Sequence, residues 1–528
     1  MGFDKKLRKR LAAQFGTAPD PHYFHGHMAY IRAYFDYRRE QDRDGFLLDE
    51  TTWNDLDMDA LFQRINPALS TSGEQYLYYM LRSPAVDQET YDQRRSLIRL
   101  MEEKPDLRLN LQVELAKLGC TRRADLCSAF QPERHGMGWL FLLLLLGLLP
   151  FAAIVFAALA PQFGVLALIG ACTVNGLVHE WRKRVVQKDF DTVNYIVSMI
   201  AALRRIQKLR DPDLDRQLEP AYESLARLRA VLRVGGVSAV SDNNGLSELL
   251  TTVLLLDLIV YEFLKNKFDR CHGDVFTVHE NLGRLDAAIA VASYRKSVET
   301  FTEPELDFAA QTPFVRAEEL VHPLLANPVS NSWKADKPIL LTGSNASGKS
   351  TYLKAAALAA VMAQSICTCP ARSYRASAIR IYSSMALRDD LLSGESYYIV
   401  ETRSLKRILD RAAGLPPVLC VIDEVLRGTN TVERIAASCE ILKAFAAQKV
   451  LCLAATHDVE LCSLLEQYDQ YHFQETVTED AVEFDYRLYP GKATSRNAIN
   501  LLHILGFPDA IVTQAHERAN GYLETGKW

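Results

Sequence analysis

The feature that most constrains the fold is a run of 43 residues, Gly136 to Val178, without any Asp, Glu, Lys or Arg. It opens with 22 nearly all apolar residues, Trp139 to Ala160. A bilayer core needs about 20 residues at 1.5 Å rise each, so this first segment is long enough to span one. After a turn expected at Pro161-Gln162, the second apolar segment, Phe163 to Val178, is shorter and only marginal for spanning. We predict a transmembrane helical hairpin over residues 136–178.

Basic residues flank this window on both sides. Arg134 precedes it, and Arg182-Lys183-Arg184 follow it. Because positive charge stays on the cytoplasmic side of a membrane, both ends of the hairpin are expected in the cytoplasm. Trp139 and Trp181 stand where interfacial aromatic residues are expected. The prediction is a bacterial-type plasma membrane location with both termini cytoplasmic. The alternatives are a helical hairpin buried in a large soluble core, or one membrane span followed by a core helix.

The rest of the chain has the composition of a globular protein of several domains. The whole chain of 528 residues has a mean hydropathy of -0.06 and a formal net charge of -5. It therefore lacks the overall positive charge that is typical of a nucleic-acid binder. The ten cysteines show no paired spacing with matching histidines, which makes a zinc site unlikely and indicates reduced, cytosolic thiols. The next apolar stretch, Leu249 to Leu264, contains Asp257 and Glu262 and is predicted to be a core helix.

A glycine-rich segment follows a short apolar strand expected at Pro338 to Thr342, and precedes a strongly helical sequence. Strand, GxxxxGK[ST] and helix in this order predict a P-loop, whose backbone N–H groups curl around phosphate oxygens. We expect Lys349 to reach the β- and γ-phosphates of ATP, and the Ser350 hydroxyl to ligate Mg²⁺. The predicted nucleotide-binding residues are Gly343, Ser344, Asn345, Ala346, Ser347, Gly348, Lys349, Ser350 and Thr351.

A second apolar strand, Val418 to Ile422, ends in the carboxylate pair Asp423-Glu424, which is the Walker B arrangement. Asp423 is expected to hold Mg²⁺, directly or through water, and Glu424 to orient and deprotonate the attacking water. A third strand, Lys449 to Thr456, ends at His457. A lone histidine there would be structural more often than not, but beside two Walker elements it is better interpreted as a γ-phosphate sensor.

Between the two Walker motifs, a Ser-Gly-x-Ser sequence ending at Ser396 opens a predicted helix. Exposed N–H groups and hydroxyls at a helix start can form a second anion site, which could serve the nucleotide of a partner subunit. The alternative is an ordinary N-cap.

With these motifs in this order, the chain resembles the MutS family of DNA mismatch-repair ATPases. The segments that carry the resemblance in the ATPase half are TGSNASGKST (342–351), DDLLSGESYYIVE (389–401), VIDEVLRGTN (421–430), ATHD (455–458) and the tail at 491–515. Weaker similarity to the family's helical core is found at 48–94, 282–297 and 321–325.

The resemblance implies a fold and a set of roles. It implies an α/β P-loop NTPase domain with a mostly parallel sheet, together with an all-α lever domain that the hairpin interrupts. ATP would sit on Gly343 to Thr351, with Asp423 and Glu424 handling metal and water. Ser396 would reach across a homodimer to the other subunit's γ-phosphate, and His457 would carry the family's switch role.

Several departures from the family pattern bear on function. About 47 residues precede the core-like region, too few for the family's mismatch-reading domain with its Phe-x-Glu wedge. The hairpin stands where the family inserts its DNA-gripping clamp, and no nuclease-like domain is expected after the ATPase. Ser344 and Ala346 replace the commoner Pro and Met of the P-loop, and neither exchange removes a phosphate ligand.

The predicted organisation has six parts. They are a basic N-terminal segment (1–47), the first part of the helical core (48–135), the hairpin (136–178), the second part of the core with lever helices (179–310), the ATPase (311–515) and a C-terminal tail (516–528). One lever helix is expected to carry an apolar face with Ile196, Met199, Ile200, Leu203 and Ile206.

Three functions compete. The first is a membrane-anchored, dimeric MutS-like ATPase that uses ATP and Mg²⁺ to move its lever helices. The second keeps the family's binding of duplex, branched or mismatched DNA, for which the resemblance is the support. The third is a membrane-associated ABC-type ATPase that acts with a membrane partner, because LLSGES echoes the signature of that class.

Overall fold

A computed structural model describes residues 2–19, 26–41, 45–121, 126–129, 138–235, 245–344, 347–385, 397–427, 429–477, 482–493, 499, 502, 504 and 506–525. The chain forms two compact units, each assembled from separate stretches. The helical unit comprises Met1–Arg43, Ile65–Tyr79 and Ser96–Lys296, and the α/β unit comprises Asp44–Arg64, Met80–Arg95 and Ser297–Trp528. The six domain bounds drawn from the sequence stay a prediction.

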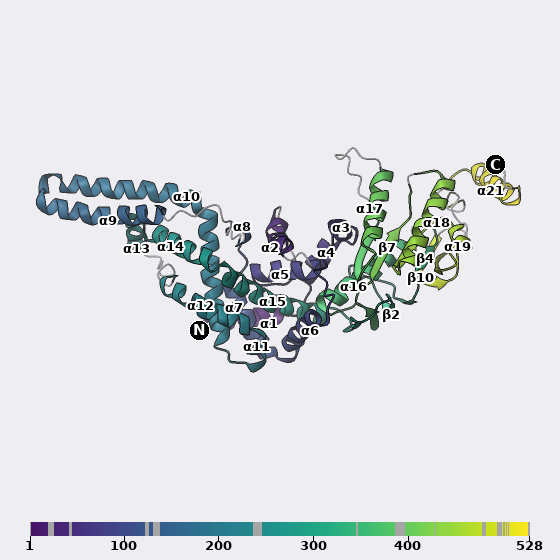
Figure 1. Ribbon diagram of the computed structural model, residues 1–528, viewed down its shortest axis with the longest axis horizontal. Coiled ribbons are helices and arrows are strands. Elements are labelled where there is room, and N and C mark those ends of the chain that lie inside the picture. Colours follow the sequence, from purple (N-terminus) through teal and green to yellow (C-terminus); the bar gives the residue numbers. More distant parts are fainter. Residues whose placement is uncertain are drawn as a thin grey trace. The chain divides into compact units, whose positions relative to one another are not determined.

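All the secondary-structure elements described up to residue 297 are helices (Figure 1). In chain order they are α1 (Gly2–Gln14), α2 (His27–Gln41), α3 (Glu50–Asp55), α4 (Met58–Ile65), α5 (Thr71–Arg82), α6 (Gln88–Glu103), α7 (Pro105–Leu118), α8 (Leu126–Ala129), α9 (Gly138–Leu159), α10 (Pro161–Gln207), α11 (Pro212–Gln217), α12 (Glu219–Gly235), α13 (Gly245–Val253), α14 (Leu256–Arg270) and α15 (His272–Ser297).

The core of the helical unit lies along α10 and α15. Residues 275–295 of α15 are almost entirely buried, and the predicted apolar face of α10, from Ile196 to Ile206, is buried as expected. Small residues allow close packing here: a Cβ on Gly73 of α5 would overlap the carboxylate of Asp286 of α15. The basic N-terminal helix α1 also belongs to this unit, because Leu11 is buried against α7.

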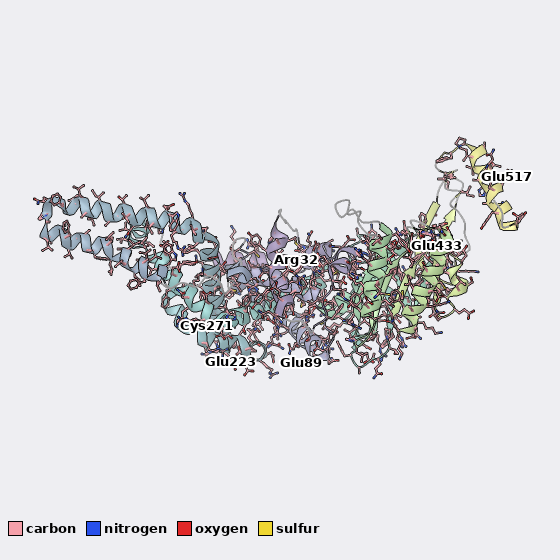
Figure 2. All side chains as sticks on the ribbon, turned by 45° about the horizontal axis from the view of Figure 1, so that its top comes forward. Arg32, Glu89, Glu223, Cys271, Glu433 and Glu517 are labelled. Atoms are coloured by element: carbon pink, nitrogen blue, oxygen red, sulfur yellow. The ribbon has the colours of Figure 1, made fainter. Side chains whose placement is uncertain are left out.

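The predicted hairpin is formed by α9 and the first half of α10. The chain turns at Ala160, and α10 then continues unbroken for 47 residues, well beyond the end of the apolar window. Both α9 and Pro161–Gln187 of α10 are long and apolar enough to cross a membrane. Most of their large apolar side chains are exposed and project away from the hairpin (Figure 2). A core helix of a soluble protein would bury them instead.

The prediction of a single core helix over 249–264 is wrong. This stretch forms the end of α13 and the start of α14, which meet at Leu254-Leu255. Leu255 adopts a left-handed conformation with φ of 56° and starts α14. Leu249, Leu250 and Leu256 are exposed rather than buried.

The strands that the structure describes lie in the α/β unit. They are β1 (Glu305–Asp307), β2 (Val315–Leu320), β3 (Asn331–Ala335), β4 (Ile339–Thr342), β5 (Ser373–Ser377), β6 (Arg380–Ser384), β7 (Val418–Asp423), β8 (Leu451–Ala455), β9 (Asp469–Val477) and β10 (Val482–Pro490). The accompanying helices are α16 (Lys349–Ile366), α17 (Tyr397–Arg411), α18 (Thr431–Ala447), α19 (Leu461–Leu464) and α21 (Asp509–Thr525), the last of which extends into the predicted tail.

The larger sheet has six strands in the order β10-β9-β4-β8-β7-β6. All its neighbours are parallel except β10 and β9, which confirms the predicted, mostly parallel sheet. The three strands expected from the sequence are β4, β7 and β8, and they lie side by side with β8 in the middle. A smaller four-stranded sheet, in the order β1-β5-β2-β3, was not predicted.

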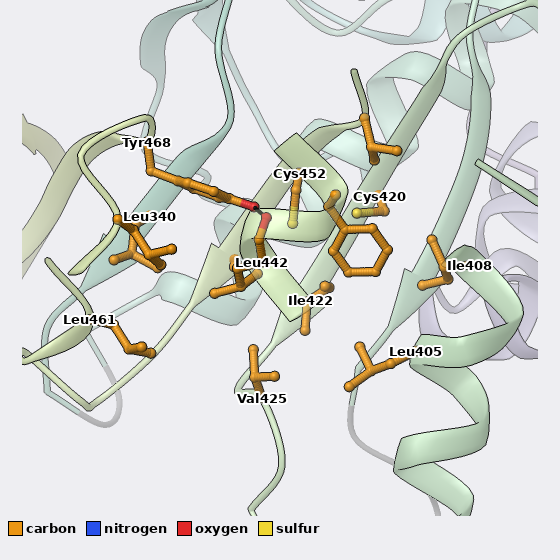
Figure 3. Close-up of a cluster of buried hydrophobic side chains, with 14 of the residues drawn as sticks. Leu340, Leu405, Ile408, Cys420, Ile422, Val425, Leu442, Cys452, Leu461 and Tyr468 are labelled. Carbon is orange, nitrogen blue, oxygen red and sulfur yellow. Dashed lines mark hydrogen bonds between the residues drawn. The ribbon is translucent and has the colours of Figure 1, made fainter. Parts of the chain in front are cut away.

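Alternating apolar residues of the central strands form the core on one face of this sheet (Figure 3). Leu340, Cys420, Ile422 and Cys452 contact side chains of α17, α18 and the segment around α19. The Tyr468 hydroxyl donates a hydrogen bond to the Leu442 carbonyl at 2.8 Å, so this buried phenol is satisfied. The core fixes the strand ends where the motif residues lie.

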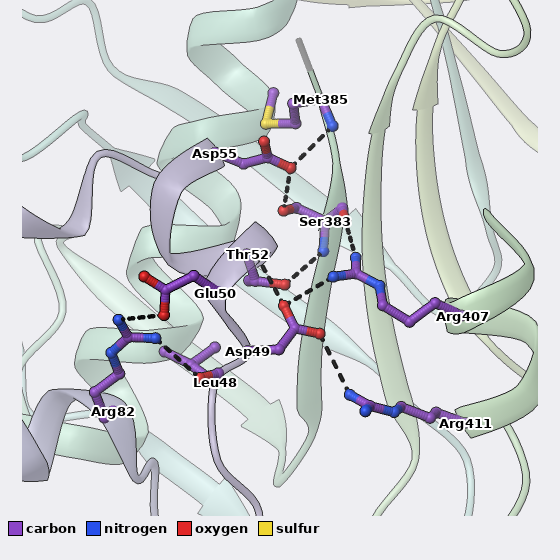
Figure 4. Close-up of polar contacts among 10 residues, drawn as sticks. All are labelled: Leu48, Asp49, Glu50, Thr52, Asp55, Arg82, Ser383, Met385, Arg407 and Arg411. Carbon is purple, nitrogen blue, oxygen red and sulfur yellow. Dashed lines mark hydrogen bonds and ion pairs between the residues drawn. The ribbon is translucent and has the colours of Figure 1, made fainter. Parts of the chain in front are cut away.

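A polar network holds α3 against β6 and α17 (Figure 4). Asp49 caps α3 by accepting from Thr52 N at 2.9 Å, and the same carboxylate pairs with Arg407 of α17 at 2.9 Å. Asp55 accepts from the Ser383 hydroxyl at 2.6 Å and from Met385 N at 3.0 Å. Residues expected in the helical core therefore help to position α17, the helix that follows the predicted second anion site.

Candidate functional site

The predicted P-loop leaves the carboxyl end of β4 and enters α16. Gly343 has φ of 146° and Gly348 has φ of 103°, both in the region that favours glycine. Space also requires glycine, because a Cβ on Gly343 would lie 2.9 Å from the Phe473 carbonyl oxygen. The predicted residues Asn345 and Ala346 lie outside the described residues. The described part of the loop has the backbone that a phosphate cradle requires.

The Lys349 amine points back into this loop. Its Nζ donates to the carbonyl oxygens of Gly343 at 2.8 Å and of Ser344 at 2.6 Å, and the side chain is buried. Burial lowers the pKa of this ammonium to about 8, although the carboxylates of Asp423 and Glu424 favour its charged form. A cation is thus held where phosphate oxygens are expected.

The two Walker motifs meet through a hydrogen bond. The Ser350 hydroxyl at the start of α16 donates to Asp423 Oδ2 at the end of β7, at 2.6 Å. Ser347 Oγ donates to the Ser344 carbonyl at 2.8 Å, which tightens the loop, and the Ser344 hydroxyl donates to the Glu475 carboxylate. The structure therefore brings together the two predicted metal ligands, Ser350 and Asp423.

Glu424 and His457 are also adjacent, although they are 33 residues apart. His457 Nε2 lies 3.1 Å from Glu424 Oε1, at the ends of β8 and β7. This hydrogen bond, with a smaller contribution from Arg427, lowers the pKa of the Glu424 carboxyl. Glu424 itself has φ of 63°, unusual for a residue with a side chain. The carboxylate is kept ionised and is directed toward the predicted sensor.

Two unpredicted residues, Arg427 and Glu401, contact the segment that carries Asp423 and Glu424. Arg427 Nε lies 2.6 Å from Glu424 Oε2, and its Nη2 donates to the Asp423 carbonyl at 3.1 Å. Glu401 of α17 is buried and accepts from Leu426 N at 2.6 Å and from Arg427 N at 3.0 Å. Glu401 ends the segment 389–401 that carries the family resemblance, but no spacing rule indicated that either residue would contact the loop after β7.

A cavity of about 280 Å³ opens beside the loop. Its walls are mainly apolar and aromatic, and Gly348 and Thr351 connect it to the predicted phosphate site. The lining residues are Leu320, His322, Leu325, Asn327, Pro328, Val329, Asn331, Gly348, Thr351, Tyr352, Ala355, Phe473 and Tyr486. Burial lowers the pKa of His322 to about 4, so its imidazole is neutral at physiological pH. A flat, uncharged ring system suits such a cavity.

Of the predicted site residues, those at the ends of β4, β7 and β8 converge on one edge of the sheet. Ser396 lies outside the described residues, which resume at Tyr397 of α17. Its expected reach to a partner's nucleotide therefore stays a prediction.

Comparison with known proteins agrees with this geometry. The family model MutS domain V matches residues 339–522. The DNA mismatch repair protein MutS of Natronomonas pharaonis is 37% identical over 195 residues, which is 35% of this chain and 22% of the relative. The DNA mismatch repair protein MSH3 of Yarrowia lipolytica is 33% identical over 200 residues, 37% of this chain and 20% of the relative.

A longer match includes part of the helical unit. The probable DNA mismatch repair protein Msh6 of Drosophila melanogaster is 28% identical over 283 residues, 49% of this chain and 23% of the relative. The matches thus cover between a fifth and a quarter of the length of these relatives. Each relative is named as a mismatch-repair protein, which gives no support to the ABC-type alternative. Residues 339–522 match the family model MutS domain V, and over this domain the chain is similar to mismatch-repair proteins of the MutS family.

Proposed function

We propose that this chain is a membrane-anchored MutS-like ATPase that hydrolyses ATP with Mg²⁺ in a homodimer and transmits the nucleotide state to its helical unit. The observation that carries the ATPase proposal is the convergence of Lys349, the Ser350–Asp423 hydrogen bond and the Glu424–His457 pair at one sheet edge. A cation, a pair of metal-ligating oxygens and an ionised base are the groups that phosphoryl transfer to water requires.

The nucleotide fits this edge with its phosphates in the loop and its adenine in the neighbouring cavity. Phosphates placed in the loop between Gly343 and Thr351 receive backbone N–H groups and the Lys349 amine. The adenine then enters the adjoining cavity, where Tyr352, Phe473 and Tyr486 supply aromatic walls. The neutral His322 adds no charge against the base.

The residues present also fit a magnesium ion. Mg²⁺ prefers oxygen ligands and is commonly held by one or two protein oxygens together with water and substrate phosphates. Ser350 Oγ and Asp423 Oδ2 are 2.6 Å apart, so small adjustments let both face one ion. When bound, the ion would neutralise charge on the β- and γ-phosphate oxygens.

Glu424 is the proposed general base. Its lowered pKa keeps the carboxylate ready to accept a proton from water as the water oxygen attacks the γ-phosphorus and the bond to the ADP oxygen breaks. In the described arrangement, Arg427 and His457 both hold this carboxylate. Release of one of these contacts on ATP binding would free Glu424 for water, which gives His457 its proposed switch role.

Substitutions in purified protein test the ATPase proposal. Lys349→Ala should abolish nucleotide binding, whereas Glu424→Ala should bind ATP and fail to turn it over. Glu433→Gln is a matched control, because this exposed glutamate lies in the first turn of α18 and pairs with Thr429 instead of the cluster. Undiminished turnover by Glu424→Ala would remove Glu424 from its role.

The membrane part of the proposal rests on exposure and length. Nearly all large side chains from Phe141 to Leu159 are apolar and exposed, and the cytoplasmic side would carry Arg182, Lys183 and Arg184. We propose that the hairpin anchors the protein in a bacterial-type plasma membrane with both units in the cytoplasm. Membrane fractionation followed by an alkaline carbonate wash tests this; recovery of the protein in the soluble fraction would overturn the anchor.

DNA binding is a second candidate function, favoured by the mismatch-repair names of the relatives. It predicts ATP-dependent binding of duplex or branched DNA. A titration with salt decides it, since phosphate contacts release counterions and give a steep salt dependence. Affinity no higher than that of an unrelated acidic protein would exclude DNA handling and leave the ATPase proposal intact.

A further inference from the structure

The corner between α13 and α14 lies against the hairpin, in the part of it away from its tip (Figure 1). Gly147 of α9 makes the close approach possible, because a Cβ there would lie 2.9 Å from the Leu254 carbonyl oxygen. Leu255, at the corner itself, is fully buried. The corner is therefore packed tightly onto the apolar hairpin.

Asn175 of α10 ties the three elements together. Its Nδ2 donates to the Leu146 carbonyl of α9 at 2.9 Å and to the Val253 carbonyl at the end of α13 at 2.7 Å. The side chain is fully buried. Carbonyl groups at a helix end lack an intrahelical donor, and hydrocarbon supplies none. An amide that satisfies the end of α13 from the neighbouring helix is the arrangement that backbone at membrane depth requires.

The level of the membrane surface is marked by a polar layer at the base of the hairpin. The Trp139 and Trp181 rings lie 5.8 Å apart, and the Arg182 guanidinium lies 4.4 Å from the Trp139 ring centre. Arg182 also pairs with the buried Glu262 of α14 at 2.7 Å. Tryptophan and arginine together are typical of the interface between hydrocarbon and water.

The corner lies deeper than this layer. Gly147 is eight residues beyond Trp139, and Asn175 is six residues before Trp181. At 1.5 Å per residue these positions are about 12 Å and about 9 Å from the tryptophans, and half of a hydrocarbon core is about 15 Å. The hydrogen bonds of Asn175 thus hold the corner within the cytoplasmic half of the core.

The outward face of the corner is suited to lipid. Leu249, Leu250 and Leu256 expose 59%, 49% and 42% of their surface. The first acidic residue of α14, Asp257, turns inward and pairs with His179 at 2.9 Å. These three leucines are thus exposed, while Asp257 contacts His179 of the neighbouring helix.

We propose that the α13–α14 corner is a re-entrant element that inserts into the cytoplasmic leaflet, with phospholipid acyl chains as its occupant. The membrane anchor then consists of the hairpin and this corner. The proposal rests on the membrane anchoring proposed above and adds a contact surface to it.

Photocross-linking in the full-length protein tests the insertion. A benzoylphenylalanine is introduced at Leu250 or Leu256, at Phe156 in the hairpin, and at Lys267, an exposed position further along α14. The protein is reconstituted in nanodiscs of phosphatidylcholine and phosphatidylglycerol, irradiated, and analysed by mass spectrometry. Lipid adducts are expected at the corner and at Phe156, with at least a tenfold lower yield at Lys267.

The outcomes separate the two proposals. Adducts at Phe156 without adducts at the corner overturn the re-entrant element and leave the hairpin anchor in place. Loss of adducts at all apolar positions overturns both. Cross-links from the corner to a second copy of the chain, instead of to lipid, also overturn the proposal.

A second measurement tests the role of Asn175. Asn175→Leu removes the donor to Val253, and the lipid adduct yield at Leu256 should fall severalfold while the yield at Phe156 is unchanged. Thr173→Val is the matched control, because Thr173 is exposed on the same helix and donates within it to Ile169. Equal adduct yields at Leu256 in Asn175→Leu and Thr173→Val would contradict the role of the Asn175 hydrogen bond in positioning the corner.

Discussion

Raising the pH above about 8 should weaken ATP binding through Lys349. Its ammonium is buried in the loop, which lowers its pKa from 10.5 to about 8. A bound triphosphate favours the charged form, so the pKa should rise again in the complex. Binding above pH 8 therefore takes up a proton, and affinity is lost as pH rises through the pKa of the free protein.

The size of the effect follows from the fraction of charged amine. With a pKa of about 8, about three quarters of the Lys349 side chains are charged at pH 7.5 and about one tenth at pH 9. If the bound amine stays charged, the Kd should rise about eightfold between these values, which is about 1.2 kcal/mol.

Isothermal titration calorimetry with a non-hydrolysable ATP analogue and Mg²⁺ measures this directly. Repeating the titration near pH 8 in buffers of different ionisation enthalpy should reveal uptake of about half a proton. Lys349→Arg is the control, because guanidinium stays charged throughout and any remaining affinity should not vary. A constant Kd in the wild-type protein, or the same pH dependence in Lys349→Arg, would refute the reasoning.

Three further predictions concern positioning and stability. In Glu401→Gln one side-chain oxygen remains to accept from Leu426 N and Arg427 N, where the carboxylate has two. The kcat should therefore fall on the order of tenfold in steady-state kinetics, while the ATP affinity measured by binding stays nearly unchanged. Gly73→Ala forces a methyl group into the Asp286 carboxylate and should cost about 1–3 kcal/mol in urea unfolding, whereas Gly273→Ala, with open space around it, should be near neutral. Burial raises the pKa of Asp286 to about 7, so the contribution of this residue to stability should be fully present below its unfolded-state pKa of about 4 and be lost as pH rises toward 7. Asp286→Asn should remove this part of the pH dependence from urea midpoints measured at several pH values.

The sequence was sufficient for the parts of the site that depend on local pattern. The expected strand at 338–342 is β4 at Ile339–Thr342, and the strand at 418–422 is β7 at Val418–Asp423. Apolar runs of four or five residues ended by glycine or carboxylates leave few other structures open. Parallel pairing then brings their carboxyl ends together, which explains why Ser350 meets Asp423 as predicted.

Contacts between distant segments were not predictable in this way. Glu401 accepts a hydrogen bond from Leu426 N, which is 25 residues further along the chain. No spacing rule relates a helix to the loop that follows the next strand. Asp257 and Glu262 favoured one core helix over 249–264, and nothing in one sequence shows that a left-handed Leu255 divides this stretch into two helices. The sequence also does not show that Asp257 contacts His179 and that Glu262 pairs with Arg182.

The continuity of α10 gives the proposed coupling a physical route. Its 47 residues extend about 70 Å at 1.5 Å per residue, with the exposed apolar segment at one end and the buried face from Ile196 to Ile206 at the other. The described helix contains no proline after its first residue, so it has no built-in kink of that kind. A rod of this length turns a small rotation of its buried end into a displacement several times larger at the hairpin. If the core-facing residues move with the nucleotide state, the hairpin must move with them or α10 must bend. Either change would alter the contacts of Asn175 and Arg182, which join the hairpin to α13 and α14.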